Sequence, residues 1–346
     1  EELKLPGLRE ALIKIHAPDN LGEAELAKRR LTFDEALLLQ VLLAQRRAEI
    51  SSLTATPRSI SKDGLVSKFE EKLPFKYTDG QIEVNREIEA DMQKPHPMHR
   101  LLQGEVGSGK TIVALRAALH VIDAGAQVAL LAPTEVLAQQ HHRTILKQLG
   151  ALATKGQLGA PEESIEIALL TGSMSASEKK EIQARCKDGQ IDLVIGTHAL
   201  LSDSVNFADL GLVIVDEQHR FGVEQRDALR AKAKTPPHLL VMTATPIPRT
   251  VAITVFGDLD ISTLTELPLG RAPIATHLVN AMTKPAFLER AWQRIREEVA
   301  AGHQAYVVAP RISSESAEDA DIDFLFGTES KDLNSVTELA PKLSSS

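Results

Sequence analysis

The chain has 346 residues, 43% hydrophobic and 25% charged, which is close to the average of soluble globular proteins and long enough for two or three domains. Its single cysteine, Cys186, excludes an internal disulfide, and the net charge of −8, concentrated from Arg311 onward, gives no support for a nucleic-acid partner. No apolar run reaches the ~18 residues that span a membrane, and the first residues lack the pattern of a signal peptide, so we expect a cytoplasmic protein.

The N-terminal part is predicted to be helical and to end in a linker. Residues 1–20 contain Pro6 and Gly7 and form an irregular segment with one short helix at most. Residues 23–50 have no Pro or Gly, and their leucines recur near helical spacing, which predicts one long helix or a helical pair. Residues 51–68, rich in Ser and Thr, are typical of a linker or mobile loop. The basic residues of the helical run are expected to form a solvated face: Lys28, Arg29, Arg30, Arg46 and Arg47.

The stretch 104–111 fills the pattern G-x-x-x-x-G-K-[ST], which is typical of a loop whose backbone N–H groups bind a di- or triphosphate. The residues expected to bind the nucleotide are Gly104, Gly107, Ser108, Gly109, Lys110 and Thr111. Lys110 supplies a charge for the β- and γ-phosphates, and the Thr111 hydroxyl is placed to ligate Mg²⁺. Residues 112–122 should form a helix whose positive dipole end faces the phosphates. By itself this pattern predicts phosphate binding and nothing more.

Short apolar segments then alternate with helical ones. Strands are predicted at 128–132, 165–170, 191–195, 210–215 and 238–242. Helices are predicted at 134–149, 177–188 and 223–233, and Ser175 and Glu178 have the spacing of a capping box before the second of these. This alternation predicts βαβ units around a mostly parallel, buried sheet, the α/β class.

We expect three parts in the chain. They are a helical connector and linker over 1–70, an ATP-binding α/β lobe over 71–268, and the start of a second α/β lobe over 269–346. The last part offers a helix at 284–301 and a strand at 304–310, followed by an acidic, serine-rich tail. The second lobe is therefore expected to be incomplete in this chain.

Two further polar clusters directly follow predicted strands. The strand 210–215 is followed by Asp216 and Glu217, and the next strand by Thr243 and Thr245. Ligands of open parallel sheets bind beyond the carboxyl ends of the strands. We assign Asp216 to Mg²⁺ through its water shell, and Glu217 to polarising the attacking water. The two threonines are placed to hydrogen-bond the acidic segment and to sense the γ-phosphate.

Taken together, these motifs resemble the superfamily 2 helicases, and among them the RecG family of bacterial branch-migrating DNA helicases. The resemblance extends over nearly all of the chain and rests on 73–81, 101–111, 132–141, 196–201, 215–226 and 242–250. It implies a RecA-like first lobe that uses ATP and Mg²⁺. It also implies a motor that moves on double-stranded DNA and remodels stalled forks and four-way junctions in recombination and repair.

The resemblance also assigns residues around the nucleotide. Gln81 is similar to the adenine-reading glutamine of the family, with Phe75 or Tyr77 lining the base, and a glutamine amide can both donate to and accept from adenine. Gln218 is similar to a residue that couples nucleotide state to Thr243 and Thr245. The catalytic residues that it implies are Lys110, Asp216, Glu217 and His219.

A third group of residues resembles the family's contacts to the nucleic-acid backbone. In such motors these contacts use main-chain N–H and hydroxyl groups and do not read sequence. The matching residues are Pro133, Thr134, Glu135, Gly172, Thr197 and His198. The implied partners are branched or duplex DNA and a single-strand-binding protein, with no membrane, and we expect a monomer.

RecG-family proteins carry an OB-fold wedge domain before the connector, and their second lobe supplies arginines that reach the γ-phosphate. These 346 residues contain neither. An arginine of this kind is worth ~10³–10⁵ in rate in the GTPases. We therefore expect these residues to bind ATP but to hydrolyse it poorly and not to unwind DNA.

Other interpretations stay open. A DNA translocase of the transcription-repair coupling type shares part of 215–226 and 242–250, although Ser108 and Gln218 favour the RecG family. A nucleotide-gated DNA-binding module without catalysis is a second alternative. A small-molecule kinase with a phosphate loop is a third, and the three strand-end clusters argue against it.

Overall fold

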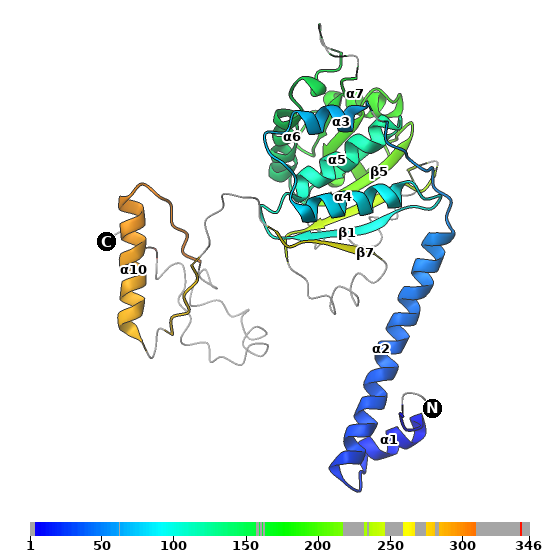
Figure 1. Cartoon of the computed structure of the whole chain (residues 1–346), viewed down its shortest axis with the longest axis vertical. Helices are drawn as coiled ribbons and strands as arrows, with labels where there is room; N and C mark the ends of the chain where they lie inside the picture. Colours follow the sequence, from blue (N-terminus) through cyan, green and yellow to red (C-terminus); the bar gives the residue numbers. More distant parts are fainter. Residues whose placement is uncertain are drawn as a thin grey trace. The chain divides into compact units, whose positions relative to one another are not determined.

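The computed structural model describes residues 4–61, 63–156, 159, 161, 163–216, 232–233, 235–245, 259–266, 275–280, 284–308 and 340 (Figure 1). The chain divides into two compact units, residues 1–271 and 272–346, and each is described by itself. Within the described ranges, no helix combines the length and the apolar character that crossing a bilayer would require.

The first unit begins with two helices that pack together. Helix α1 (Leu8–His16) contacts α2 (Leu21–Ser52), whose first turn is capped by the Asn20 side chain accepting from the Glu23 N–H at 3.0 Å. Residues 1–20 thus contain one short helix, within the prediction, and of the two alternatives for 23–50 the structure has one long helix and not a helical pair. Apolar residues occur all round α2, so several of its leucines are more than one third exposed in this chain: Leu26, Leu37, Leu38, Leu39 and Leu42.

The predicted linker is irregular in its backbone, but it is not a free loop. Residues 54–61 have no regular secondary structure, yet the Ala55 N–H donates to the Pro95 carbonyl and the buried Arg58 forms an ion pair with Asp209 at 2.9 Å. Helix α3 (Leu65–Glu71) follows and buries Phe69 in the lobe core. Of the predicted linker or mobile loop over 51–68, the irregular backbone of 54–61 fits a linker but not a mobile loop, and α3 fits neither. Single buried anchors such as Arg58 have no repeating pattern in the sequence.

The centre of the first unit is a seven-stranded sheet in the order β3-β4-β2-β5-β6-β1-β7. Every described pair of neighbouring strands is parallel, which confirms the α/β prediction. The strands are β1 (His99–Gly104), β2 (Gln127–Leu131), β3 (Ile167–Leu170), β4 (Leu193–Gly196), β5 (Leu210–Asp216), β6 (His238–Thr243) and β7 (Asp260–Leu264). The five predicted strands are found within a few residues, and β1 and β7 were not predicted.

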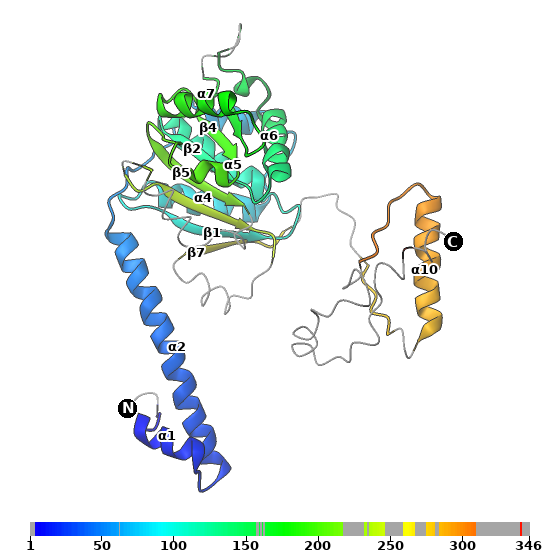
Figure 2. The same cartoon turned by 180° about the vertical axis from the view of Figure 1, so that it is seen from behind.

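Both faces of the sheet are covered by side chains, as expected for parallel strands. In β5, Leu212 and Ile214 belong to one hydrophobic cluster while Val213 and Val215 belong to the other. Figure 1 shows helix α3 and other helices on one face of the sheet, and Figure 2 gives the view from behind. The remaining helices of the unit are α4 (Asp79–Met92), α5 (Lys110–Asp123), α6 (Glu135–Leu149) and α7 (Ala176–Lys187), with short 3₁₀ turns at Gly150–Ala153 and His198–Leu201.

The helices predicted at 112–122, 134–149 and 177–188 are confirmed, including the capping box of Ser175 and Glu178 before α7. The helix predicted at 223–233 lies almost wholly outside the described residues. In the second unit, α10 (Pro285–Ala300) begins with a proline in its first turn and matches the prediction. The strand predicted at 304–310 is not found over 304–308, which has no regular structure.

A buried arginine joins the edge strand β7 to the rest of the lobe. Arg100 in β1 forms an ion pair with Asp91 of α4 at 2.6 Å, and its guanidinium also donates to the Ser262 hydroxyl of β7 at 2.6 Å and to Glu87 at 2.9 Å. A planar guanidinium with five N–H donors can satisfy all three partners at once. Arg100 therefore ties β7, β1 and α4 into one body beneath the phosphate loop.

Protonation of His238 is expected to destabilise this lobe in acid. His238 begins β6, is 2% exposed, and accepts the Met98 N–H at Nδ1 over 3.0 Å. Burial, followed by the positive charge of Arg58, lowers the pKa of His238 from 6.5 to about 4. As the pH falls from 6.5 to 4, His238 is therefore protonated in the unfolded chain but stays neutral in the folded chain. The free energy of unfolding decreases by about 3 kcal/mol over this pH range.

The change His238→Asn should remove this dependence, because Asn offers an acceptor to the Met98 N–H and does not titrate. Chemical denaturation at a series of pH values measures the slope. Asn at the exposed His16 is the matched control and should keep the wild-type slope. An unchanged slope in His238→Asn would contradict the assignment.

Candidate functional site

Three polar strand ends meet at one edge of the sheet. The phosphate loop follows β1, Asp216 ends β5, and Thr243 ends β6, which lies between them. The parallel register pairs Asp216 with Met242 and Gln103 with Thr243, so all three strands stop at nearly the same level. Neighbouring strands lie ~5 Å apart, which places the loop and Asp216 about two strand spacings from each other.

The backbone of the loop has the geometry that a phosphate cradle requires. Gly107 and Gly109 have φ values of 85° and 89°, a region that favours glycine. Helix α5 starts at Lys110, so its unpaired N–H groups face the loop. The Lys110 ammonium donates to the carbonyls of Gly104 at 2.7 Å and Glu105 at 2.9 Å. The loop thus combines a lysine ammonium, backbone N–H groups and the half-buried Thr111. These groups fit a polyphosphate with bound Mg²⁺.

Gln81 connects the start of α4 to this loop. Its Oε1 accepts the Thr78 N–H at 3.1 Å in a capping box, while its Nε2 donates to the Ser108 carbonyl at 2.9 Å. Only 3% of Gln81 is exposed. The amide therefore braces the loop, and its predicted contact with adenine would use the remaining donor and acceptor capacity.

The two aromatic candidates for the base lie in different surroundings. Tyr77 packs against the lobe core, and burial raises the pKa of its phenol. Phe75 is 49% exposed. Of the two, Phe75 has the free surface that stacking on a base needs.

Asp216 has a partner that the sequence did not identify. The imidazole Nε2 of His141, in α6, lies 2.6 Å from Asp216 Oδ2, and both side chains are about one seventh exposed. The sequence placed His141 inside a motif but gave it no function. Its α6 helix follows β2, the neighbour of β5, and this topology could have indicated the pairing only once the strand order was known.

The threonine cluster is also partly as expected. The hydroxyls of Thr243 and Thr245 hydrogen-bond to each other at 2.9 Å, and Thr243 is 1% exposed. Their predicted bond to the acidic segment stays a prediction, because Glu217, Gln218 and His219 lie outside the described residues. The described part of the chain contains no cluster of three His, Cys, Asp or Glu that would hold a metal by itself.

The predicted DNA-contact residues follow the other half of the sheet. Pro133, Thr134 and Glu135 come after β2, Gly172 after β3, and Thr197 and His198 after β4. The Thr134 hydroxyl accepts the Leu137 N–H and caps α6. The order β3-β4-β2 therefore puts these residues side by side along the same edge as the nucleotide loop.

Within this group, Glu135 already has hydrogen-bond partners in the protein. Its carboxylate accepts from the Ser173 N–H at 3.0 Å and from the Ser173 hydroxyl at 2.5 Å, and the hydroxyl bond lowers the pKa of Glu135. A carboxylate repels phosphate, so Glu135 suits a positioning function for the loop at Gly172 better than a direct DNA contact. Thr197 is 8% exposed, whereas His198 is exposed, so of these two His198 is the one at the surface.

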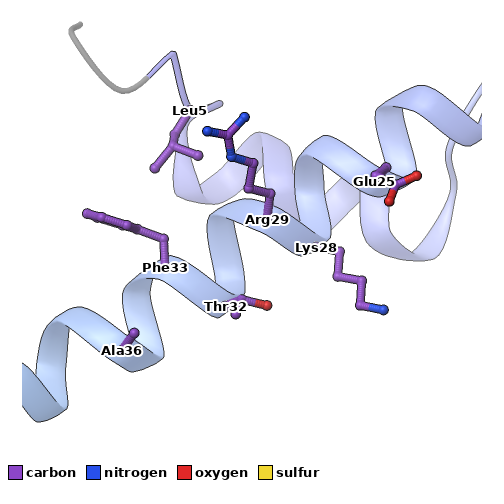
Figure 3. Close-up of a pocket in the computed structure, with 7 residues that line it drawn as sticks. All are labelled: Leu5, Glu25, Lys28, Arg29, Thr32, Phe33 and Ala36. Atoms are coloured by element: carbon purple, nitrogen blue, oxygen red, sulfur yellow. The ribbon is translucent and has the colours of Figure 1, made fainter. Parts of the chain in front are cut away.

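A surface pocket of about 520 Å³ lies elsewhere, on the helical pair (Figure 3). Its lining combines apolar and charged side chains of α2 with one residue before α1: Leu5, Glu25, Lys28, Arg29, Thr32, Phe33 and Ala36. No residue of the phosphate loop or of the strand-end clusters takes part. This pocket is therefore separate from the nucleotide site.

Comparison with known proteins gives consistent matches. A model of the DEAD/DEAH box helicase family matches residues 81–253, half of the chain. An ATP-dependent DNA helicase RecG of Mycobacterium tuberculosis is 57% identical over 316 residues, covering 90% of this chain and 42% of that relative. The RecG helicase of Bacillus subtilis is 44% identical, covering 89% and 43%.

A solved structure of RecG bound to a three-way DNA junction is similar as well, with a TM-score of 0.76 and 39% identity. The similarity covers 93% of this chain and 41% of that one. The chain thus spans about two fifths of the length of the relatives that it matches.

The change Gly109→Ala should weaken binding of a magnesium nucleotide by about tenfold or more, since each ~1.4 kcal/mol lost is a factor of ten. A Cβ at this position would lie 2.2 Å from Gln81 Nε2, at a φ that already strains an alanine. Gly125→Ala is the matched control, because it carries the same strain at φ 80° but has nothing within 4 Å. It should lose about 1 kcal/mol of stability and keep its affinity. Titration with a fluorescent ATP analogue measures the affinity of both variants, and chemical denaturation measures their stability. Equal nucleotide affinities of the two variants would contradict the bracing of the loop by Gln81.

Proposed function

The chain belongs to the DEAD/DEAH box helicase family, and we propose that it is the ATP-binding part of a DNA helicase that remodels branched DNA, such as stalled forks and four-way junctions, in recombination and repair. The observation that carries the proposal is the convergence of the phosphate loop, Asp216 and Thr243 on three neighbouring strands. The 57% identity to a RecG helicase over 90% of the chain supports the choice of DNA over other substrates.

Different residues of the site are proposed to bind the phosphates, the base, the metal and the attacking water. The loop N–H groups and Lys110 bind and orient the β- and γ-phosphates, and Phe75 and Gln81 hold the base. Thr111 and Asp216 would hold Mg²⁺, which neutralises charge on the phosphates when bound. Glu217 orients and polarises the attacking water, and His219, Gln218 and the two threonines connect this step to the second lobe.

DNA is proposed to lie along the other half of the edge. The strand ends after β3, β4 and β2 offer main-chain N–H groups and His198 to the phosphate backbone, which positions DNA without reading its sequence. The relative whose structure contains a three-way DNA junction supports a branched substrate.

We assign residues 1–70 to the connector, 71–268 to the first RecA-like lobe and 269–346 to the beginning of the second. The 346 residues on their own are proposed to bind ATP but to turn it over slowly, because they span about two fifths of the length of their relatives. We further propose that the whole protein acts as a cytoplasmic monomer, and that a single-strand-binding protein is among its partners.

Substitution of the acids and the lysine in the whole protein tests the assignment. Glu217→Gln should keep ATP affinity but lower DNA-stimulated turnover by roughly 10²–10⁴-fold, since it removes the group that takes part in proton transfer. Lys110→Ala should weaken nucleotide binding itself. Steady-state hydrolysis with forked, four-way, duplex and single-stranded DNA, together with ATP binding, measures both. Full DNA-stimulated turnover in Glu217→Gln would refute the proposed catalytic function of this acid.

Hydrolysis assays, together with measurements of DNA and RNA polymerase binding, separate the alternatives. A nucleotide-gated DNA-binding module predicts that DNA leaves hydrolysis unchanged while ATP still changes DNA affinity. A translocase of the coupling type predicts binding to RNA polymerase, and the proposed helicase predicts the strongest stimulation by forked or four-way DNA.

A further inference from the structure

We propose that His141 is a positioning residue that holds the Asp216 carboxylate for magnesium and couples that carboxylate to the DNA-contacting half of the lobe. The inference rests on the proposed function. It adds a residue to the ATP site from a helix that begins in the predicted DNA-contact segment.

The first step is the contact itself. His141 Nε2 lies 2.6 Å from Asp216 Oδ2, with the two side chains 13% and 15% exposed. At this distance a protonated Nε2 donates a short, charge-assisted hydrogen bond to the carboxylate. Because the pair is largely shielded from solvent, water competes weakly for either partner. The bond fixes the rotation of the carboxylate and engages Oδ2, while Oδ1 has no other hydrogen bond within the described residues.

The second step is the position of the histidine along α6. The helix starts at Glu135, directly after its N-cap Thr134, and His141 lies six residues further on, or about 9 Å along the axis. The start of the helix is tied to the neighbouring loop by the two hydrogen bonds from Ser173 to Glu135. One helix therefore carries predicted DNA contacts at its N-terminus and, almost two turns later, the histidine that bonds to Asp216.

The third step is the mechanical connection. Ala138 and Ile145 of α6 are buried in the core, so the helix is packed on the sheet as one rigid element that carries a displacement of its start along to His141. A hydrogen bond of 2.6 Å tolerates little displacement, so a shift of roughly 1 Å at α6 would weaken it. DNA binding at the start of α6 would in this way change how firmly Asp216 is held.

The test uses the whole protein and two changes at this position. His141→Ala removes the donor, whereas His141→Gln offers an amide N–H at comparable reach. His142→Ala is the matched control, because His142 is the next residue of the same helix, is partly buried like His141, and its burial lowers its pKa without any contact to Asp216. Circular dichroism checks that all variants keep their helices.

The first readout is binding, not turnover. The affinity for a fluorescent ATP analogue is titrated against Mg²⁺, and again in EDTA. His141→Ala should need ~10-fold more Mg²⁺ for half of the full affinity, the usual cost of removing a partner of a metal-binding group, with the EDTA affinity unchanged. His141→Gln should return to within about threefold of the wild type, and His142→Ala should match the wild type.

The second readout is coupling. Forked DNA should lower the Mg²⁺ requirement of the wild type, or raise its turnover, more than it does for His141→Ala, while DNA affinity without nucleotide stays equal.

A wild-type Mg²⁺ requirement in His141→Ala would overturn the positioning function, and a Gln variant as defective as Ala would overturn the hydrogen bond as its basis. Equal responses of both proteins to DNA would overturn the coupling. Absence of DNA stimulation in the wild type would instead refute the proposed function, and the Mg²⁺ titration would still test the positioning.

Discussion

The parallel pairing of β5, β6 and β1 is the constraint on which the rest of the lobe depends. Gly104, Asp216 and Thr243 are far apart in the sequence, and each ends one of three adjacent strands. Since side chains alternate along a strand, a slip of one residue would turn Asp216 to the other face of the sheet and away from the loop. The alternation of Leu212 and Ile214 with Val213 and Val215 between two hydrophobic clusters fixes that register.

The same edge divides into two halves with different chemistry. The ends of β5, β6 and β1 carry the groups for phosphate and metal, and the ends of β3, β4 and β2 carry the proposed DNA contacts. The boundary runs between β2 and β5, and the bond between His141 and Asp216 crosses it. The proposed function requires the ATP site to respond to DNA, and this bond joins a side chain of one half directly to a side chain of the other.

The sequence predicted the strands whose residues are mostly apolar, because short runs rich in Val, Ile and Leu between turn residues favour a buried strand. It missed β1 and β7, whose polar residues Arg100 and Ser262 are buried because Arg100 bonds to Ser262 and also to the carboxylates of Asp91 and Glu87. The positions of the phosphate loop, Asp216 and Thr243 at the ends of their strands were predictable, since each is a local pattern. The contact of His141 with Asp216 was not, because it depends on β2 and β5 being neighbours, which no local pattern specifies.

A structure of the whole protein with Mg²⁺, a non-hydrolysable ATP analogue and forked DNA tests the account most directly. The account predicts phosphates within the loop 104–111, Asp216 facing the magnesium hydration shell while still bonded to His141, and the DNA backbone along 133–135, 172 and 197–198. DNA bound to a different surface of the lobe, or Asp216 turned away from the metal, would contradict it.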